Sequence, residues 1–211
     1  MSATEQTTRA FEGLATRLDA TGFRSAGFTG ALMGEGASTI ALGTALALTA
    51  LRRDSVLLVD ANWLQPSLTS DAKCDTAPGL ADYLAGKAQL ATVIRPGSST
   101  RPAFLPIGDR GVARPALRSL AAFLTTDVAS FQTVLVDLPP VLAGEQFVLP
   151  WATLVDQIFV VLREAATPLG LIRQTLDKIG LATPPQIVLN RTQAPSAESA
   201  AALVAAPNTR T

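Results

Sequence analysis

A glycine-rich stretch from Gly30 to Thr39 has the composition of a phosphate-binding loop. It follows an apolar run that favours a strand and opens an Ala/Leu-rich run that favours a helix, which is the context such a loop requires. Glycines let successive N–H groups converge on an anion, and the N-terminus of the next helix adds positive potential. The sequence therefore predicts phosphate contacts from Gly34, Glu35, Gly36, Ala37, Ser38 and Thr39.

The loop departs from the complete motif G-x-x-x-x-G-K-[ST] at two positions. Ala31 stands where the first glycine belongs, and Ala37 stands where the lysine belongs. A lysine at about 4 Å from phosphate is worth about 4 kcal/mol at an effective dielectric constant of about 20. We therefore expect weakened ATP binding and still weaker phosphoryl transfer. Arg163, after a predicted strand, is a candidate substitute cation, with a solvated loop arginine as the alternative interpretation.

Short apolar runs predict the elements that would position this loop. They are continuous rather than alternating, which is typical of strands buried on both faces of a parallel sheet. The predicted strands are Ala26–Leu32, Val56–Val59, Val134–Val136, Ile158–Leu162 and Ile187–Leu189, with Phe104–Ile107 as a further candidate. The predicted helices are Thr8–Leu18, Ser38–Arg52, Pro115–Leu124, Pro168–Ile179 and Glu198–Ala206, and Ser67–Pro78 is predicted to be a loop.

Alternating strands and helices indicate βαβ units. The sequence thus predicts an α/β fold, with a single domain whose mostly parallel β-sheet is flanked by helices on both faces. We expect residues 1–24 to form a lead-in helical segment, residues 25–192 the P-loop NTPase-like domain and residues 193–211 a C-terminal tail.

Composition narrows the classes of function. Of the 211 residues 48% are apolar and 16% charged, so a sizeable core is expected. The net charge is zero, so no nucleic-acid partner is expected. The chain has one cysteine and no histidine, which excludes an internal disulfide and every histidine-based mechanism. The apolar stretch Thr39–Leu51 is too short to span a bilayer, so we expect a cytoplasmic protein, peripheral at the inner membrane only through a partner.

Three further motifs occur in the order found in one protein family. Val56–Leu68 is similar to that family's L-L-I-D-A-D-x-R-x-P-x-L, Gly79–Gly86 to G-L-x-x-x-L-x-G, and Val134–Val141 to I-I-D-x-P-P. Between Phe11 and Arg191 the chain resembles the bacterial tyrosine kinase (CpsD/CapB-like) branch of the MinD/ParA P-loop ATPase superfamily, as a degenerate member that lacks the loop lysine.

The resemblance implies roles for individual residues. Ser38, Asp60 and Asp137 would hold or orient Mg²⁺ if a nucleotide binds, and Asn190, followed by Arg191, would contact the base. It implies ATP with Mg²⁺ as a weak cofactor, with no cofactor as the alternative. The residues themselves leave another interpretation open, because Ser38 is also a good first-turn residue and the two aspartates also suit strand-end turns.

Other positions depart from the family pattern. Asn62 stands where the kinases have an acidic residue, Leu64 replaces an arginine, and Tyr83 is the one tyrosine in place of a C-terminal cluster. The lead-in helix carries Arg9 and Glu12 in partly reversed charge order, which leaves homo-oligomer formation open. These departures predict no tyrosine autophosphorylation.

Three hypotheses follow from this comparison. The leading one is a catalytically degenerate kinase-like regulator or partner of a polysaccharide copolymerase, the chain-length-determinant membrane protein of exopolysaccharide or capsule synthesis and export. The second is an active ATPase with an atypical P-loop. The third is a MinD/ParA-like positioning or scaffolding protein, although the tail Ser196–Ala206 has no basic face.

Overall fold

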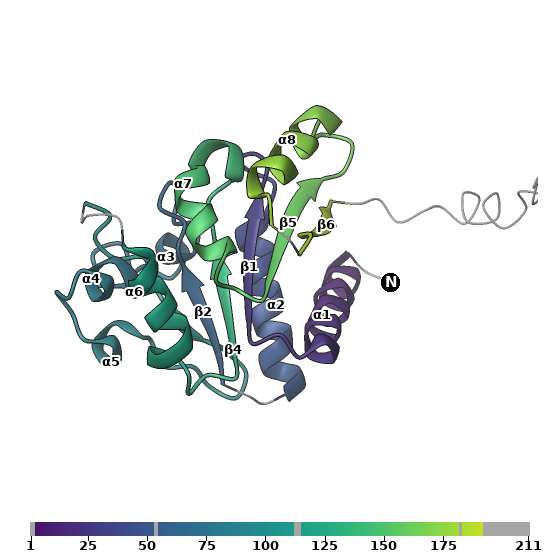
Figure 1. Ribbon diagram of the computed structural model, residues 1–211. Helices are drawn as coiled ribbons and strands as arrows, with labels where there is room; N and C mark the ends of the chain where they lie inside the picture. Colours follow the sequence, from purple (N-terminus) through teal and green to yellow (C-terminus); the bar gives the residue numbers. More distant parts are fainter. Residues whose placement is uncertain (1–2, 53–54, 112–114, 182, 192–211) are drawn as a thin grey trace, which may run out of the picture.

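Six parallel strands form the centre of the molecule in the computed structural model, which describes residues 3–52, 55–111, 115–181 and 183–191 (Figure 1). Their order across the sheet is β3-β2-β4-β1-β5-β6. The strands are β1 (Ser25–Gly30), β2 (Val56–Asp60), β3 (Ala103–Leu105), β4 (Thr133–Asp137), β5 (Gln157–Arg163) and β6 (Gln186–Asn190). All pairings are parallel, so the predicted single α/β domain with a parallel sheet is confirmed.

Helices cover both faces of this sheet (Figure 1). They are α1 (Ala3–Thr21), α2 (Ala37–Arg52), α3 (Ser67–Asp71), α4 (Leu80–Leu84), α5 (Leu90–Val93), α6 (Leu117–Ala122), the π-helical turn η1 (Phe123–Asp127), α7 (Val141–Ala152) and α8 (Leu169–Ile179). On one face α2 packs on the sheet and α1 packs beside α2, and Leu48 of α2 shares an apolar cluster with Phe28 and Leu135. On the other face α6, η1, α7 and α8 pack on the sheet, with Trp151 in the apolar cluster.

The central strands are buried and mostly apolar because each of their faces meets a helix layer. Every residue of β2 and β4 is buried. The two edge strands differ from this pattern: β3 has only three residues, and β6 exposes Ile187 and Leu189. No helix within the described residues has both the length and the hydropathy needed to cross a membrane.

The described part of the chain contains four helices that the sequence did not predict, which are α3, α4, α5 and α7. The predicted loop Ser67–Pro78 contains α3, in which Thr69 donates hydrogen bonds from its N–H and its hydroxyl to Asp60. Helix α7 was not predicted, because Gly144 and Pro150 lie within it; Gly144 adopts φ −139° and ψ 34° and divides it into two helical pieces. The predicted helix Glu198–Ala206 and the tail lie outside the described residues.

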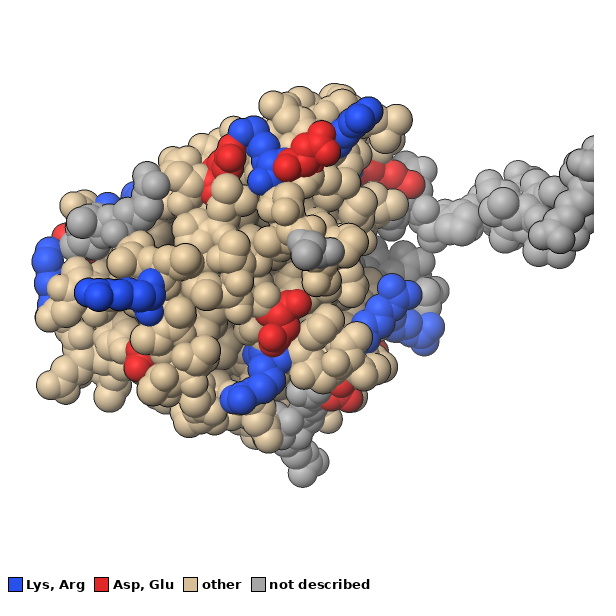
Figure 2. Space-filling model, viewed as in Figure 1, with Lys and Arg blue, Asp and Glu red and all other residues tan. Residues whose placement is uncertain are grey.

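Basic and acidic side chains are interspersed on the face shown in Figure 2. Neither sign gathers into a large patch there, and most of the visible surface carries no charge. An ion pair between Lys178 and Glu145 links α8 to α7. The stability of this domain therefore depends mainly on apolar burial on the two faces of the sheet.

Two leucines on strands test this distribution of stability. Leu135 in β4 is 0% exposed and Leu189 in β6 is 55% exposed. Leu135→Ala should lower the free energy of unfolding by about 3 kcal/mol, because it leaves a cavity in the packed centre. Leu189→Ala, the same chemical change at the edge, should lower it by less than about 1 kcal/mol. Urea denaturation followed by circular dichroism measures both, and equal losses would contradict the assigned burial.

Candidate functional site

The predicted phosphate loop lies at the carboxyl edge of the sheet, between the end of β1 at Gly30 and the start of α2 at Ala37. Gly34 and Gly36 have φ values of +80° and +93°, in the left-handed region that favours glycine. At Gly36 a Cβ atom would also collide with the side-chain amide of Asn190. Both glycines are therefore required by the backbone path of the loop.

Glu35 turns its side chain back into this loop. Its side chain is buried, and Oε2 accepts hydrogen bonds from the N–H groups of Ala31 at 2.5 Å and Leu32 at 2.9 Å. The hydroxyl of Thr167, from the turn between β5 and α8, donates to Oε1. The sequence predicted Glu35 as a phosphate contact but gave no sign of these partners, because Thr167 is distant in the chain.

Asp60 and Asp137 lie side by side at the same edge, since they are partners in the parallel register of β2 and β4. Both are fully buried. Asp60 accepts hydrogen bonds from the Thr69 N–H at 2.8 Å, the Thr69 hydroxyl at 2.7 Å and the Asn62 N–H at 3.1 Å. In contrast, neither carboxylate oxygen of Asp137 has a hydrogen-bond partner in the described part of the chain.

Burial raises the pKa of both acids. For Asp60 the hydrogen bonds from Thr69 and Asn62 and the charge of Arg110 oppose this rise. For Asp137 burial, followed by the neighbouring Asp60 carboxylate, raises the pKa well above 3.8. The Ser38 hydroxyl opposes the rise of the Asp137 pKa from nearby, without reaching hydrogen-bond geometry. Two adjacent buried carboxylates favour a shared proton or a bound cation over two free charges.

Asn190, predicted to contact a nucleotide base, is engaged within the protein. Its Nδ2 donates to the carbonyl oxygen of Glu35 at 2.8 Å, and its Oδ1 accepts from the N–H of Arg191 at 2.8 Å. Arg191 is exposed, with φ +57°. A base contact from Asn190 stays a prediction, and it would require the amide to exchange at least one of these partners.

Arg110 is a cation near the aspartates that sequence reasoning missed. It follows β3, and its Nη1 donates to the carbonyl oxygens of Trp63 at 3.1 Å and Leu64 at 3.2 Å. Its charge is close enough to Asp60 to lower the pKa of that acid. Arg163, the cation that the sequence suggested as a substitute, is exposed at the end of β5. No local pattern around Arg110 marks it, because its position depends on the pairing of β3 with β2.

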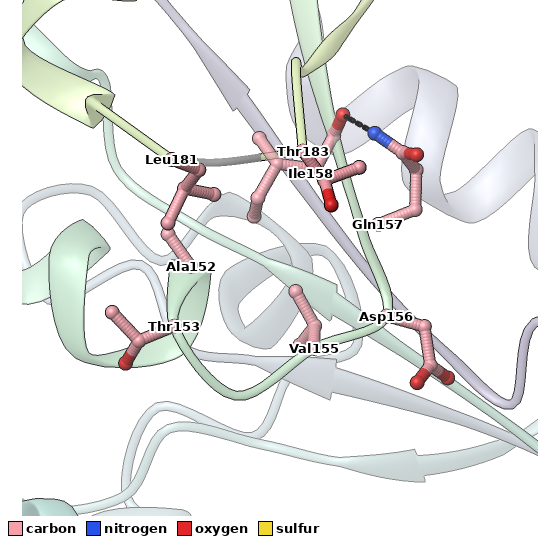
Figure 3. Close-up of a pocket in the computed structure, with 8 residues that line it drawn as sticks. All are labelled: Ala152, Thr153, Val155, Asp156, Gln157, Ile158, Leu181 and Thr183. Carbon is pink, nitrogen blue, oxygen red and sulfur yellow. Dashed lines mark hydrogen bonds between the residues drawn. The ribbon is translucent and has the colours of Figure 1, made fainter.

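Two cavities lie away from the phosphate loop. One, of about 350 Å³, is at the amino end of β5 and is lined by Ala152, Thr153, Val155, Asp156, Gln157, Ile158, Leu181 and Thr183 (Figure 3). Its Asp156 has a structural role, since Oδ2 accepts from the N–H groups of Arg24 and Ser25. The other, of about 630 Å³, lies between α1 and α2. Neither cavity includes a residue of the loop.

The raised pKa values predict a pH dependence of stability. The folded state binds more protons than the unfolded chain above pH 3.8, so the stability contributed by these acids is greatest below that pH and falls as the pH rises. Asp137→Asn stays neutral and should therefore melt at a higher temperature than the wild type at about pH 7, with a difference that shrinks toward about pH 4.

Thermal denaturation in EDTA across this pH range measures the effect. Asp177→Asn is the control, because Asp177 is exposed on α8, where it pairs with Arg173. An Asp137→Asn variant that is less stable than the wild type at neutral pH would contradict the conclusion that the buried charge of Asp137 destabilises the fold.

Comparison with known proteins shows similarity in structure but not in sequence. No family model and no curated protein matches the sequence. The structure matches the kinase domain of VpsO with TM-score 0.76 and 22% identity, covering 89% of this chain and 95% of that one. It matches the kinase domain of Escherichia coli tyrosine kinase ETK with TM-score 0.73 and 22% identity, covering 89% and 78%.

A more distant match is a nucleotide-bound enzyme. Cobyrinic acid a,c-diamide synthase from Mycobacterium smegmatis, with bound ADP and magnesium, matches with TM-score 0.59 and 20% identity, covering 79% of this chain and 72% of that one. This chain therefore has the parallel α/β fold of bacterial tyrosine kinase domains, a P-loop fold that also includes MinD.

Proposed function

We propose that this chain is a catalytically degenerate protein of the bacterial tyrosine kinase type, which regulates or partners a polysaccharide copolymerase in exopolysaccharide or capsule synthesis and export. The likeness in fold to the VpsO and ETK kinase domains supports the type of protein. The observation that carries the proposal is Ala37, which leaves the loop without a lysine beside the buried pair Asp60 and Asp137.

The charge balance at this edge supports weak nucleotide binding. A triphosphate brings several negative charges toward two adjacent carboxylates, of which Asp60 already raises the pKa of Asp137. The absence of a lysine removes about 4 kcal/mol of attraction for each phosphate charge that would lie about 4 Å from it, at an effective dielectric constant of about 20. The guanidinium of Arg110 is already engaged by the carbonyl oxygens of Trp63 and Leu64.

The only tyrosine of the chain is poorly suited as a phosphate acceptor. The phenol of Tyr83 donates a hydrogen bond to Asp127 at 2.6 Å, and its ring packs against Phe123. Burial and the Asp127 carboxylate raise the pKa of Tyr83 to about 12. Deprotonation for attack on a phosphoryl group is therefore disfavoured, which supports the absence of tyrosine autophosphorylation.

A working ATPase with an atypical P-loop is the second candidate. It is favoured by Asp137, whose two buried oxygens lack partners close to the Ser38 hydroxyl. Carboxylate and hydroxyl oxygens are the ligands that Mg²⁺ prefers, so Ser38, Asp60 and Asp137 fit this ion. When bound there, Mg²⁺ would neutralise the acids and orient phosphate oxygens.

The reverse substitution tests the nucleotide part of the proposal. The wild type should bind Mg·ATP with millimolar affinity or not measurably, and Ala37→Lys should strengthen binding at least about tenfold, since part of the lost charge attraction is regained. Ala37→Met is the matched control, because it adds similar length without charge. Isothermal titration calorimetry measures all three proteins.

Two results would contradict this proposal. Micromolar Mg·ATP binding by the wild type would overturn the loss of nucleotide function. Steady ATP hydrolysis that disappears in Asp137→Ala would establish the second candidate instead.

The proposed partner is tested by co-purification. A chain-length-determinant membrane protein encoded beside this chain should co-purify with it from detergent-solubilised membranes, equally with and without ATP, because the proposed contact needs no nucleotide. Recovery only with ATP would contradict a nucleotide-independent regulator. Nucleotide-dependent sedimentation with liposomes or DNA would instead favour a MinD/ParA-like positioning protein.

A further inference from the structure

We propose that Glu35 is a built-in anion of the phosphate loop, whose carboxylate holds the loop in shape without a bound phosphate, and that removal of this side chain opens a site for a small free anion. This inference deepens the proposed function and rests on it for the meaning of the loop. The role of Glu35 is tested with small anions, in the absence of ATP.

The partners of Glu35 are of the kind that bind free anions in loops. Its carboxylate accepts two consecutive backbone N–H groups, from Ala31 and Leu32, together with the hydroxyl of Thr167. Consecutive N–H groups that converge on one oxygen form an anion-binding concavity. In the described part of the chain no lysine or arginine forms an ion pair with Glu35, so neutral donors satisfy its charge.

The surrounding backbone is fitted to this carboxylate. A Cβ atom at Gly30 would lie 2.7 Å from Oε2 of Glu35, so a side chain at position 30 would displace this carboxylate. Glu35 itself is only 4% exposed. The carboxylate therefore occupies a specific internal position rather than a solvated one.

Glu35 also joins three segments of the carboxyl edge. The Thr167 hydroxyl that donates to it accepts the N–H of Arg163 at 3.2 Å, at the end of β5. The carbonyl oxygen of Glu35 accepts the amide of Asn190, at the end of β6. β5 and β6 are themselves paired, with Arg163 opposite Asn190. Glu35 thus ties the loop to β5 through its side chain and to β6 through its main-chain carbonyl.

This arrangement stabilises the shape of the loop in a chain that has Ala37 in place of the lysine. A loop of converging N–H groups without an anion would leave buried donors unpaired, which is unfavourable. Glu35 supplies acceptors from inside the chain. Its negative charge also adds to that of Asp60 and Asp137 against an incoming phosphate.

Anion rescue of a Glu35 variant tests the inference. Glu35→Ala should melt lower than the wild type by on the order of 5 °C, since charge-assisted hydrogen bonds are lost. Sodium formate or inorganic phosphate should restore at least half of that loss relative to sodium chloride of equal ionic strength. The same salts should shift the wild type and the control Glu12→Ala equally little, because Glu12 is exposed on α1.

Glu35→Gln provides a second test, which can be used if Glu35→Ala does not fold. Glutamine fills the same volume without charge, so it should lose stability but gain nothing specific from formate, because the position stays occupied. Thr167→Val should likewise destabilise without anion rescue. A Glu35→Ala variant as stable as the wild type, or one that formate and phosphate stabilise no more than chloride does, would overturn the inference. If Glu35→Ala does not fold, a Glu35→Gln variant as stable as the wild type would overturn it. Tight ATP binding by the wild type would overturn only the proposed function.

Discussion

Two buried carboxylates lie side by side at the carboxyl edge because β2 and β4 pair in parallel with Asp60 opposite Asp137. This juxtaposition sets the electrostatics of the whole edge, since each acid raises the unfavourable energy of charging the other. Asp60 is partly compensated by Thr69 and Asn62, and through Thr69 it anchors α3. Asp137 has no such compensation in the described residues, so its charge depends on whatever binds beside it.

The predicted phosphate loop adds a further acid, Glu35, to the same edge of the sheet. Its donors are partly satisfied by Glu35, so the loop contributes a third acid to an edge where the motif would supply a lysine. The fold is that of kinase domains, while the charge pattern of the edge favours cations over anions. The fold is thus shared with these kinase domains, while Ala37 stands where the P-loop motif has a lysine.

The sequence was most informative where burial is complete. Strands such as β4 and β5 were predicted because two helix layers require apolar residues at every position, which leaves a continuous run in the chain. Helix α7 was missed because its breakers, Gly144 and Pro150, are overridden by the packing of Trp151 against the sheet. Helix α3 was missed because a hydrogen-bonded acid from another element stabilises it.

In the site, the residue types were predictable but their directions were not. The loop was suggested by its glycines and the two aspartates by the family resemblance, and the structure brings Asp60 and Asp137 together. The inward turn of Glu35 and the approach of Arg110 to Asp60 result from contacts between distant segments. No periodicity along the chain records such contacts, since they depend on how strands are ordered in the sheet.

The link from Glu35 to Asn190 also has a consequence for how the protein is made. The loop emerges early in synthesis, while its amide partner is on β6, the last strand along the described part of the chain. Chains are synthesised from the N-terminus, and contacts between distant segments form late in folding. In a nascent chain the loop therefore lacks its hydrogen bond to Asn190 until β6 has been translated and paired with β5. The carboxyl edge of the sheet is completed only at that stage.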